Sequence, residues 1–429
     1  MLLKRLLVGL PLKTTQAVHE RLSKRLALAV FASDPLSSVA YATEEILLVL
    51  VLAGAAVVTW SIPISLMIVL LLTIVTISYR QTIFEYPGGG GAYIVAKANL
   101  GELPGLTAAA ALMIDYVLTV SVSVAAGVAA VTSAVPALFP HREVLGLLGI
   151  LLLVIINLRG VRESGRIFAA PTYVFIGAIL LMLGVGLLQI LSGQSAQVLP
   201  GQAGTPAPVV EGLTLFLLLR AFSSGCTALT GIETISNGVL AFKRPEAKNA
   251  AITMAVMAVI LGTMFLGISA LAYQYGVLPR ADETVVSQIA RTVFGEGPLY
   301  YLVQASTMLI LILAANGAFA GFPRLASLLA KDSYMPHQMA VMGDRLVFSN
   351  GIIFLGVFAC SLIVLFHGET HALIPLYAVG VFLSFTLSQA GMVRRWVTKR
   401  GPHWRKKLVV NGVGAVTTAV ATVIIASTK

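Results

Sequence analysis

Residues 31–41, which read FASDPLSSVAY, decide the fold because they interrupt a segment that is otherwise apolar from 26 to 54. A helix of roughly 20 apolar residues crosses a bilayer, and here the middle of the crossing holds Asp34 and Pro35. Proline removes a backbone donor and clashes with the preceding turn. Freed carbonyls at that depth are tolerated only inside protein or beside a wet cavity. We therefore predict a broken helix whose carbonyls and carboxylate bind a cation; the alternative is a proline kink in a packed helix.

A second interruption follows about 190 residues later. Residues 222–233 read FSSGCTALTGIE, so glycines bracket polar residues and Glu233 comes directly after them. Each interruption opens a set of five apolar segments, 1 to 5 and 6 to 10. Two broken helices in corresponding positions indicate an inverted-repeat transporter with its site at the bilayer midplane. The repeat rests on hydropathy and topology, because the halves show no residue-level identity.

The composition places most of the chain in lipid. Of 429 residues, 58% are hydrophobic and 11% are charged, and the mean hydropathy is +0.92. We predict an all-α polytopic membrane protein. The eleven candidate spans are 26–54, 62–79, 103–135, 143–158, 168–191, 214–240, 249–272, 299–316, 350–366, 371–391 and 408–427.

The net charge of +11 reflects the membrane orientation of the chain and does not indicate a nucleic-acid partner. With the N-terminus inside, the cytoplasmic segments hold 24 Lys and Arg, whereas the outer loops hold only Arg142, Arg280 and Arg291. The basic residues 1–25 lack a signal-peptide pattern and are predicted to be a cytoplasmic leader. We expect a multi-pass protein of a bacterial-type plasma membrane.

The predicted domain is a single transmembrane unit, 26–429. Repeat one covers about 26–191, repeat two about 214–392, and an additional span about 408–427. Eleven spans leave the C-terminus outside, so either one span is miscounted or a twelfth lies beyond the given sequence.

The third span carries a polar stripe. Asp115, Thr119 and Ser123 follow i, i+4, i+8 spacing and therefore share one helical face. A carboxylate and two hydroxyls facing the bundle predict a cation track. The alternative is that Ser and Thr hydrogen-bond neighbouring helices or their own backbone.

Ionisable residues inside a membrane are costly and indicate function by default. The set here is Asp34, Glu44, Glu45, Asp115, Arg220 and Glu233. Glu44 and Glu45 point about 100° apart on a helix, so at most one shares the face of Tyr41. The other pairs with Arg220 or lies near the outer surface.

Other features are predicted to be structural or remain open. Cys226 and Cys360 are isolated in apolar stretches and are expected to pack, since they form neither a disulfide framework nor a zinc site. The glycine run in residues 86–93 lacks the Lys and strand of a nucleotide site. Tyr377, near Pro375, is either a cation ligand or an interfacial anchor. No nucleophile–base arrangement indicates an enzyme.

These residues resemble the amino acid–polyamine–organocation (APC) superfamily, and within it the KimA type of potassium importers, which are related to the KUP transporters. The resemblance covers essentially the whole chain. It is carried by residues 22–24 with 33–44, by the glycine loop 86–93, by Asp115 with Tyr116, and by residues 225–233.

The resemblance implies a LeuT-like fold that imports K⁺ together with protons and needs no cofactor. The ion contacts it implies are Asp34, Tyr41, Asp115, Tyr116, Thr119, Ser123, Thr227, Thr230, Glu233 and Tyr377. Glu233 and Asp115 are the candidates for proton coupling. KimA-type proteins continue through a twelfth span into a cytoplasmic domain that dimerises, and that domain is not present here. A homodimer and cyclic di-AMP control therefore stay open.

Three transport classes remain as hypotheses: proton-coupled potassium uptake, an amino acid or polyamine permease of the same fold, and an ion channel. Amino acid carboxylates are held by bare backbone N–H groups at such breaks, whereas this break carries Asp34. Two unit charges ~4 Å apart interact by about 4 kcal/mol at an effective dielectric of 20. An ionised Asp34 therefore favours a cation, although a protonated Asp34 or an ammonium ligand would admit organic substrates. Filter-like repeats typical of channels are missing from the sequence.

Overall fold

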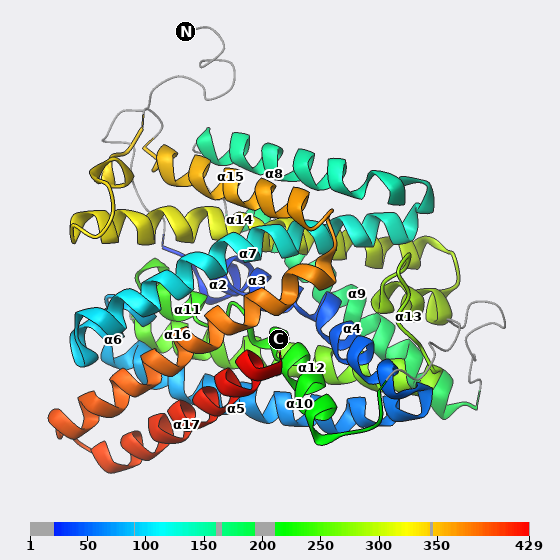
Figure 1. Cartoon of the computed structure of the whole chain (residues 1–429), viewed down its shortest axis with the longest axis horizontal. Helices are drawn as coiled ribbons and strands as arrows, with labels where there is room; N and C mark the ends of the chain where they lie inside the picture. The colour runs from blue at the N-terminus through cyan, green and yellow to red at the C-terminus, as the bar shows by residue number, and fades with distance from the viewer. Residues whose placement is uncertain (1–20, 90, 160–164, 194–210, 344–345, 429) are drawn as a thin grey trace, which may run out of the picture.

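The computed structural model describes residues 21–89, 91–159, 165–193, 211–343 and 346–428 (Figure 1). Most of the predicted leader, 1–25, and of the outer segment before residue 211 lies outside these ranges. In chain order the α-helices are α2 (Lys24–Phe31), α3 (Ser33–Ser37), α4 (Val39–Leu50), α5 (Ser61–Glu85), α6 (Ala92–Leu100), α7 (Glu102–Ala134), α8 (Arg142–Leu158), α9 (Gly165–Leu191), α10 (Leu215–Gly225), α11 (Thr234–Asn237), α12 (Glu246–Tyr275), α13 (Val285–Phe294), α14 (Pro298–Lys331), α15 (Ser349–Leu365), α16 (Thr370–Thr398) and α17 (Trp404–Thr428). The 3-10 helices are η2 (Val51–Ala53), η3 (Ala55–Trp60), η4 (Pro136–His141), η5 (Cys226–Leu229), η6 (Val239–Ala241) and η7 (His337–Ala340).

The long helices run in roughly the same direction across the molecule, with α6 at one end and α13 at the other (Figure 1). Among the described residues, nine helical segments are long and apolar enough to span a membrane. The interrupted helix α2–α4 and the shorter α15 account for the remaining two predicted spans. The described part of the chain contains no strand, only an isolated bridge between Leu22 and Phe242. The predicted all-α polytopic class is confirmed.

Helix lengths differ from the prediction where helices are buried in the bundle. The eighth span was expected to end at residue 316, yet α14 continues to Lys331. Asn316, Gly317 and Pro323 lie inside this helix rather than at its end. Buried Phe319 and Phe322 anchor this part of the helix in the core. The short helices α6 and α13 were not predicted, since each is too short to register as a span.

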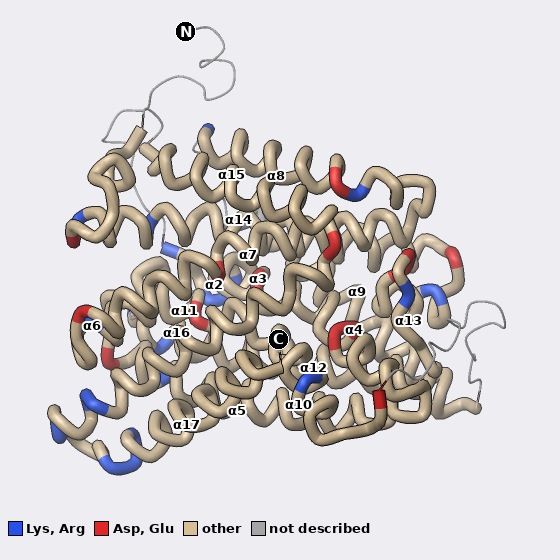
Figure 2. The backbone as a smooth tube through the Cα atoms, in the orientation of Figure 1, with Lys and Arg blue, Asp and Glu red and all other residues tan. Residues whose placement is uncertain are grey.

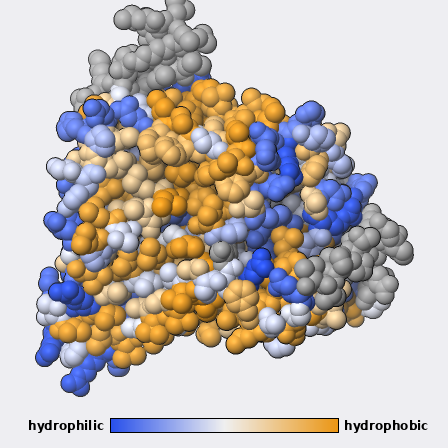
Figure 3. Space-filling view, viewed as in Figure 1, coloured by the Kyte–Doolittle hydropathy of each residue, from blue (hydrophilic) through white to orange (hydrophobic). Residues whose placement is uncertain are grey.

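The surface carries the pattern of a membrane protein. Hydrophobic residues cover much of the visible face and hydrophilic residues gather toward its ends (Figure 3). Lys and Arg are concentrated at the end that holds α6 and the turn between α16 and α17 (Figure 2). This end is the cytoplasmic one by the positive-inside rule. The chain is a multi-pass membrane protein with α13 on the outer side.

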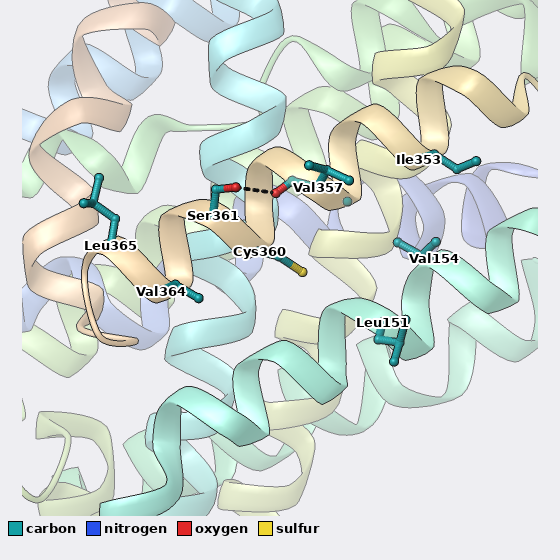
Figure 4. A pocket seen from close by; sticks show the side chains of 9 residues that line it. Leu151, Val154, Ile353, Val357, Cys360, Ser361, Val364 and Leu365 are labelled. Carbon is teal, nitrogen blue, oxygen red and sulfur yellow. Dashed lines mark hydrogen bonds between the residues drawn. The ribbon is translucent and has the colours of Figure 1, made fainter.

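An apolar cavity of about 620 Å³ lies on this lipid-facing surface, between α8 and α15 (Figure 4). Leu151 and Val154 line it from α8, while Cys360 points into it from α15. Cys226 is fully buried, and neither cysteine forms a disulfide. The residues that line the cavity are uncharged and mostly apolar.

Candidate ion-binding site

The two interruptions meet in the bundle. A Cβ atom added to Gly231 would lie 2.5 Å from Asp34 Oδ2, so the carboxylate packs directly on this glycine. Gly231 has φ +77°, which side chains other than glycine rarely adopt. Beside this contact, the Ser38 hydroxyl donates a hydrogen bond to the Ala228 carbonyl over 3.1 Å. Segments about 190 residues apart in the sequence thus form one locus.

The two breaks differ in kind. The first span remains helical in three pieces, α2, α3 and α4, joined at Ala32 and Ser38. The sixth span is unwound, because Thr230 is extended with ψ 148° before Gly231. In the first break Ser37 donates to the Asp34 carbonyl over 2.7 Å. The Pro35 carbonyl accepts hydrogen bonds from both the backbone N–H and the hydroxyl of Ser38. Serine hydroxyls therefore use part of the hydrogen-bonding capacity of the carbonyls that the sequence had suggested as free ligands.

Three carboxylates lie around this locus. Asp115 on α7 and Glu233 before α11 are each 3% exposed. Asp34 and Asp115 both interact electrostatically with Glu233. One oxygen of Asp115 and one of Glu233 are buried without a hydrogen-bond partner in the described structure. None of the three forms an ion pair with a described Lys, Arg or His, so a cation or protons must balance them.

The three carboxylates do not form a metal centre of the usual kind. The described residues contain no group of three or more His, Cys, Asp or Glu that could hold one metal ion together.

Tyr377 lies beside the same locus. It is 1% exposed, and the Thr119 hydroxyl donates to its oxygen over 3.0 Å. The phenol lies within electrostatic range of Asp34 and Asp115. The alternative role of Tyr377 as an interfacial anchor is wrong, because the residue lies inside the bundle. Ser123, on the buried face of α7, lies one turn outward from Thr119.

The hydroxyls of the sixth span are partly used by the backbone. Tyr41 lies beside Thr230, whose hydroxyl donates to the Thr227 carbonyl over 2.9 Å. The Thr227 hydroxyl donates to the Ser224 carbonyl over 2.7 Å and so satisfies the end of α10. Thr230 therefore faces the point where the two breaks meet. The main role of the Thr227 hydroxyl is to cap the C-terminal end of α10.

Tyr116 packs between helices on the inner side of the locus. Its ring lies on α14, where a Cβ atom added to Gly321 would be 2.6 Å from the ring. Its phenol is beside Asn237 and within electrostatic range of Glu233. Asn237 in turn packs on the glycine loop, because Cβ atoms at Gly89 and Gly91 would each come to 3.0 Å from it. The glycine run thus allows a loop to approach α11.

Tyr79 on α5 is a site neighbour that sequence reasoning missed. It is fully buried, its hydroxyl lies beside Ser388, and it lies within electrostatic range of Glu233. A tyrosine in an apolar helix gives no sequence signal that distinguishes it from core packing.

The outer acidic pair has a partner that the sequence did not suggest. His371, at the start of α16, lies 2.5 Å from Glu45 and 3.5 Å from Glu44. Arg220 instead pairs with Glu211 at 3.7 Å, so the suggested pairing of Arg220 with Glu44 or Glu45 is wrong. Both His371 and the acidic pair lie in the outer halves of predicted spans. This shared depth in the membrane is the sequence signal from which their pairing could have been predicted.

Glu44 also closes the outer side against α13. Its carboxylate accepts a hydrogen bond from the Val285 backbone N–H over 3.2 Å, at the first residue of α13. A cavity of about 30 Å³, enough for about one water, is lined by both Glu44 and Tyr41. Its lining residues are Ala40, Tyr41, Glu44, Ala126, Ala129, Ala130, Thr284, Thr307, Thr370 and His371. The candidate site is therefore closed from outside.

Comparisons with known proteins agree with this architecture. The family model described as amino acid permease matches residues 23–427. The chain is 52% identical over 413 residues to the potassium transporter KimA of Bacillus subtilis (strain 168), which covers 96% of this chain and 68% of that protein.

Among solved structures, the fold resembles a substrate-bound outward-open Na⁺-coupled sialic acid symporter. The TM-score is 0.53 at 14% identity, over 95% of this chain and 90% of the symporter chain. At this identity the match shows the fold alone, and the predicted LeuT-like architecture is confirmed. The protein is a transporter rather than an enzyme. The chain therefore belongs to the amino acid permease family, among its KimA-type members.

Proposed function

We propose that this protein imports K⁺ by alternating access, coupled to protons. The observation that carries the proposal is the meeting of Asp34, Asp115 and Glu233 at two helix breaks, buried and without a described basic partner. The name of the Bacillus subtilis relative, a potassium transporter, supports the same substrate. In this proposal, lipid surrounds the chain.

The carboxylates favour a small cation over an amino acid. An amino acid bound at the first break would place its carboxylate beside Asp34, where two like charges ~4 Å apart repel by about 4 kcal/mol at an effective dielectric of 20. A bare cation is attracted by a similar amount. Oxygen ligands for the cation are Asp34, Tyr41, Asp115, Tyr116, Thr119, Ser123, Thr227, Thr230, Glu233 and Tyr377.

The route follows from where these groups lie. K⁺ enters past Tyr41 and the outer cavity, passes along the Ser123, Thr119 and Asp115 face of α7, and leaves beside Glu233 near α11. The outer side is shut by Glu44 and α13. Release on the inner side then needs the glycine loop and α11 to separate, as the two bundles rock.

Glu233 and Asp115 are the proposed proton-coupling groups. Each has a buried oxygen without a hydrogen-bond partner in the described structure. In symport, one of these carboxyls takes up a proton from the outer side while K⁺ binds at the remaining carboxylates, so that fewer buried negative charges are left unpaired. The proton is then released to the inner side together with K⁺, and both move in the same direction.

Uptake of Rb⁺ as a K⁺ tracer tests the proposal in cells that lack their own potassium uptake. We expect the wild type to restore growth at low K⁺, and Asp34→Asn to reduce uptake by about tenfold or more, because a unit charge next to the ion is lost. Glu211→Gln, which removes a surface carboxylate paired with Arg220, is the matched control and should transport normally. Normal growth of Asp34→Asn, together with uptake of amino acids or polyamines that compete with Rb⁺, would show an organic substrate.

A further inference from the structure

The turn between α16 and α17 carries an unusual concentration of positive charge. Residues 392–407 contain seven Lys and Arg and no Asp or Glu. Figure 2 shows these residues gathered at one corner of the cytoplasmic end, and Figure 3 shows strongly hydrophilic surface at the same corner. Transporting a cation does not require this cluster, because it lies far along α16 from Tyr377.

Most of this charge has no acidic partner in the protein. Arg395 pairs with Glu85 and lies over the Tyr86 ring at 4.7 Å. No described acidic residue pairs with the other six. These six residues are Arg394, Lys399, Arg400, Arg405, Lys406 and Lys407. At the same end, by contrast, Lys97 pairs with Asp332 over 2.7 Å.

Two tryptophans hold the cationic side chains in place at the membrane boundary. The Arg400 and Arg405 guanidinium groups lie 5.4 Å and 5.6 Å from the centre of the Trp404 ring. Lys407 lies 4.4 Å over Trp396, whose indole N–H donates to Asn411 over 2.8 Å. Tryptophan is enriched at the interface between headgroups and acyl chains. The cations are therefore placed at the depth of the phosphates.

The helix that follows offers an apolar face continuous with the cluster. Val409, Val413, Val416 and Val420 are 63%, 45%, 63% and 53% exposed. Their spacing of three and four residues puts them on one stripe of α17. Acyl chains can lie along this stripe while their headgroup reaches the Arg405 end of the same helix.

We propose that the turn between α16 and α17, with the valine stripe of α17, binds an anionic phospholipid of the cytoplasmic leaflet. Its phosphate contacts Arg400, Arg405 and Lys406, and its chains cover the stripe. Clusters of Lys and Arg directly cytoplasmic of a transmembrane helix attract anionic headgroups. The lipid phosphate thereby balances the unpaired positive charge of this turn. The bound lipid also holds α17 against the cytoplasmic leaflet.

Native mass spectrometry of the purified full chain tests the proposal with equimolar phosphatidylglycerol and phosphatidylcholine. We expect the wild type to retain phosphatidylglycerol selectively. The triple substitution Arg400→Gln, Arg405→Gln and Lys406→Gln should reduce that preference by about tenfold or more, because each basic residue near an anionic surface adds to the attraction.

A variant of equal charge at other cytoplasmic positions separates a site from bulk electrostatics. Lys243→Gln, Lys248→Gln and Lys331→Gln remove three exposed charges that have no described acidic partner, and this variant should keep the preference. An undiminished preference in the first variant, or an equal loss in both, overturns the proposal. So does a wild-type preference that does not weaken at high salt, since headgroup attraction is screened.

Discussion

Gly231 shows how far single residues could be interpreted from the sequence. The sequence marked 225–231 as a break because glycines bracket polar residues, yet only the structure shows that Gly231 touches Asp34. Contacts between distant segments depend on how the helices pack against one another. Local sequence patterns do not specify that packing. For the same reason Tyr79 and His371 were missed, since neither residue type in its local context distinguishes a site from a core or an interface.

At the residue scale, Gly231→Ala should abolish Rb⁺ uptake. The φ of +77° costs an alanine about 1–3 kcal/mol, and the new Cβ would meet Asp34 at 2.5 Å. Uptake is measured against the amount of protein in the membrane. Gly317→Ala is the control, because nothing lies within 4 Å of its Cβ position and alanine favours the helix. Equal uptake by both variants would show that Asp34 does not need this contact.

At the element scale, the sequence predicted which segments span but not which short helices close the ends. Hydropathy found all the long apolar runs, because a bilayer demands them. Helices α6 and α13 contain 9 and 10 residues and lie at opposite ends of the bundle. Specific contacts hold these helices in place, such as the hydrogen bond from the first N–H of α13 to Glu44. A periodic pattern of apolar residues does not. Such contacts leave no periodic signal.

One such contact joins α6 to the end of α14. The Lys97 ammonium group donates a hydrogen bond to Asp332 over 2.7 Å, and the Tyr93 hydroxyl donates to the same oxygen. Hydrogen bonds from Lys97 and then Tyr93 hold the pKa of Asp332 below its ordinary value. Hydrogen bonds with Asp332 and then with Tyr93 hold the pKa of Lys97 above its ordinary value.

This link should make stability fall in acid. Because the pKa of folded Asp332 is depressed, its contribution is present above the unfolded pKa of about 3.9 and is lost as the pH falls through the lower folded value. Asp332→Asn should lower the melting temperature at neutral pH and flatten its decline in acid. Melting in detergent from pH 7 to pH 3 measures both. Glu102→Gln is a comparison on the same surface, and an identical pH profile for wild type and Asp332→Asn would contradict the expectation.

At the scale of the whole molecule, closure on the outer side depends on few contacts. Glu44 and Glu45 on α4 hold His371 on α16, and Glu44 also holds α13. These contacts join helices from both halves of the chain. Everything else that faces the outer cavity is alanine, threonine or Tyr41, so the charged contacts govern whether that side opens.

Glu45→Gln should therefore destabilise the closed state. Breaking a buried ion pair costs roughly 3–5 kcal/mol, and less here because 42% of the His371 side chain is exposed. We expect a lower melting temperature and faster labelling, by an impermeant thiol reagent, of a cysteine placed at Ala130 in a background without Cys226 and Cys360. The double variant with His371→Gln should recover part of the loss. Additive effects of the two substitutions would show that the side chains do not interact.

The contact of Asp34 with Gly231 also orders events during synthesis. The two residues are 197 positions apart (231 minus 34), so at ~5–20 residues per second about 10–40 s pass between their translation. Throughout that interval the first span lies in the membrane with its carboxylate lacking the segment against which it will rest. The first half of the chain must therefore tolerate Asp34 without its packing partner. That partner, Gly231, is synthesised only with the sixth span.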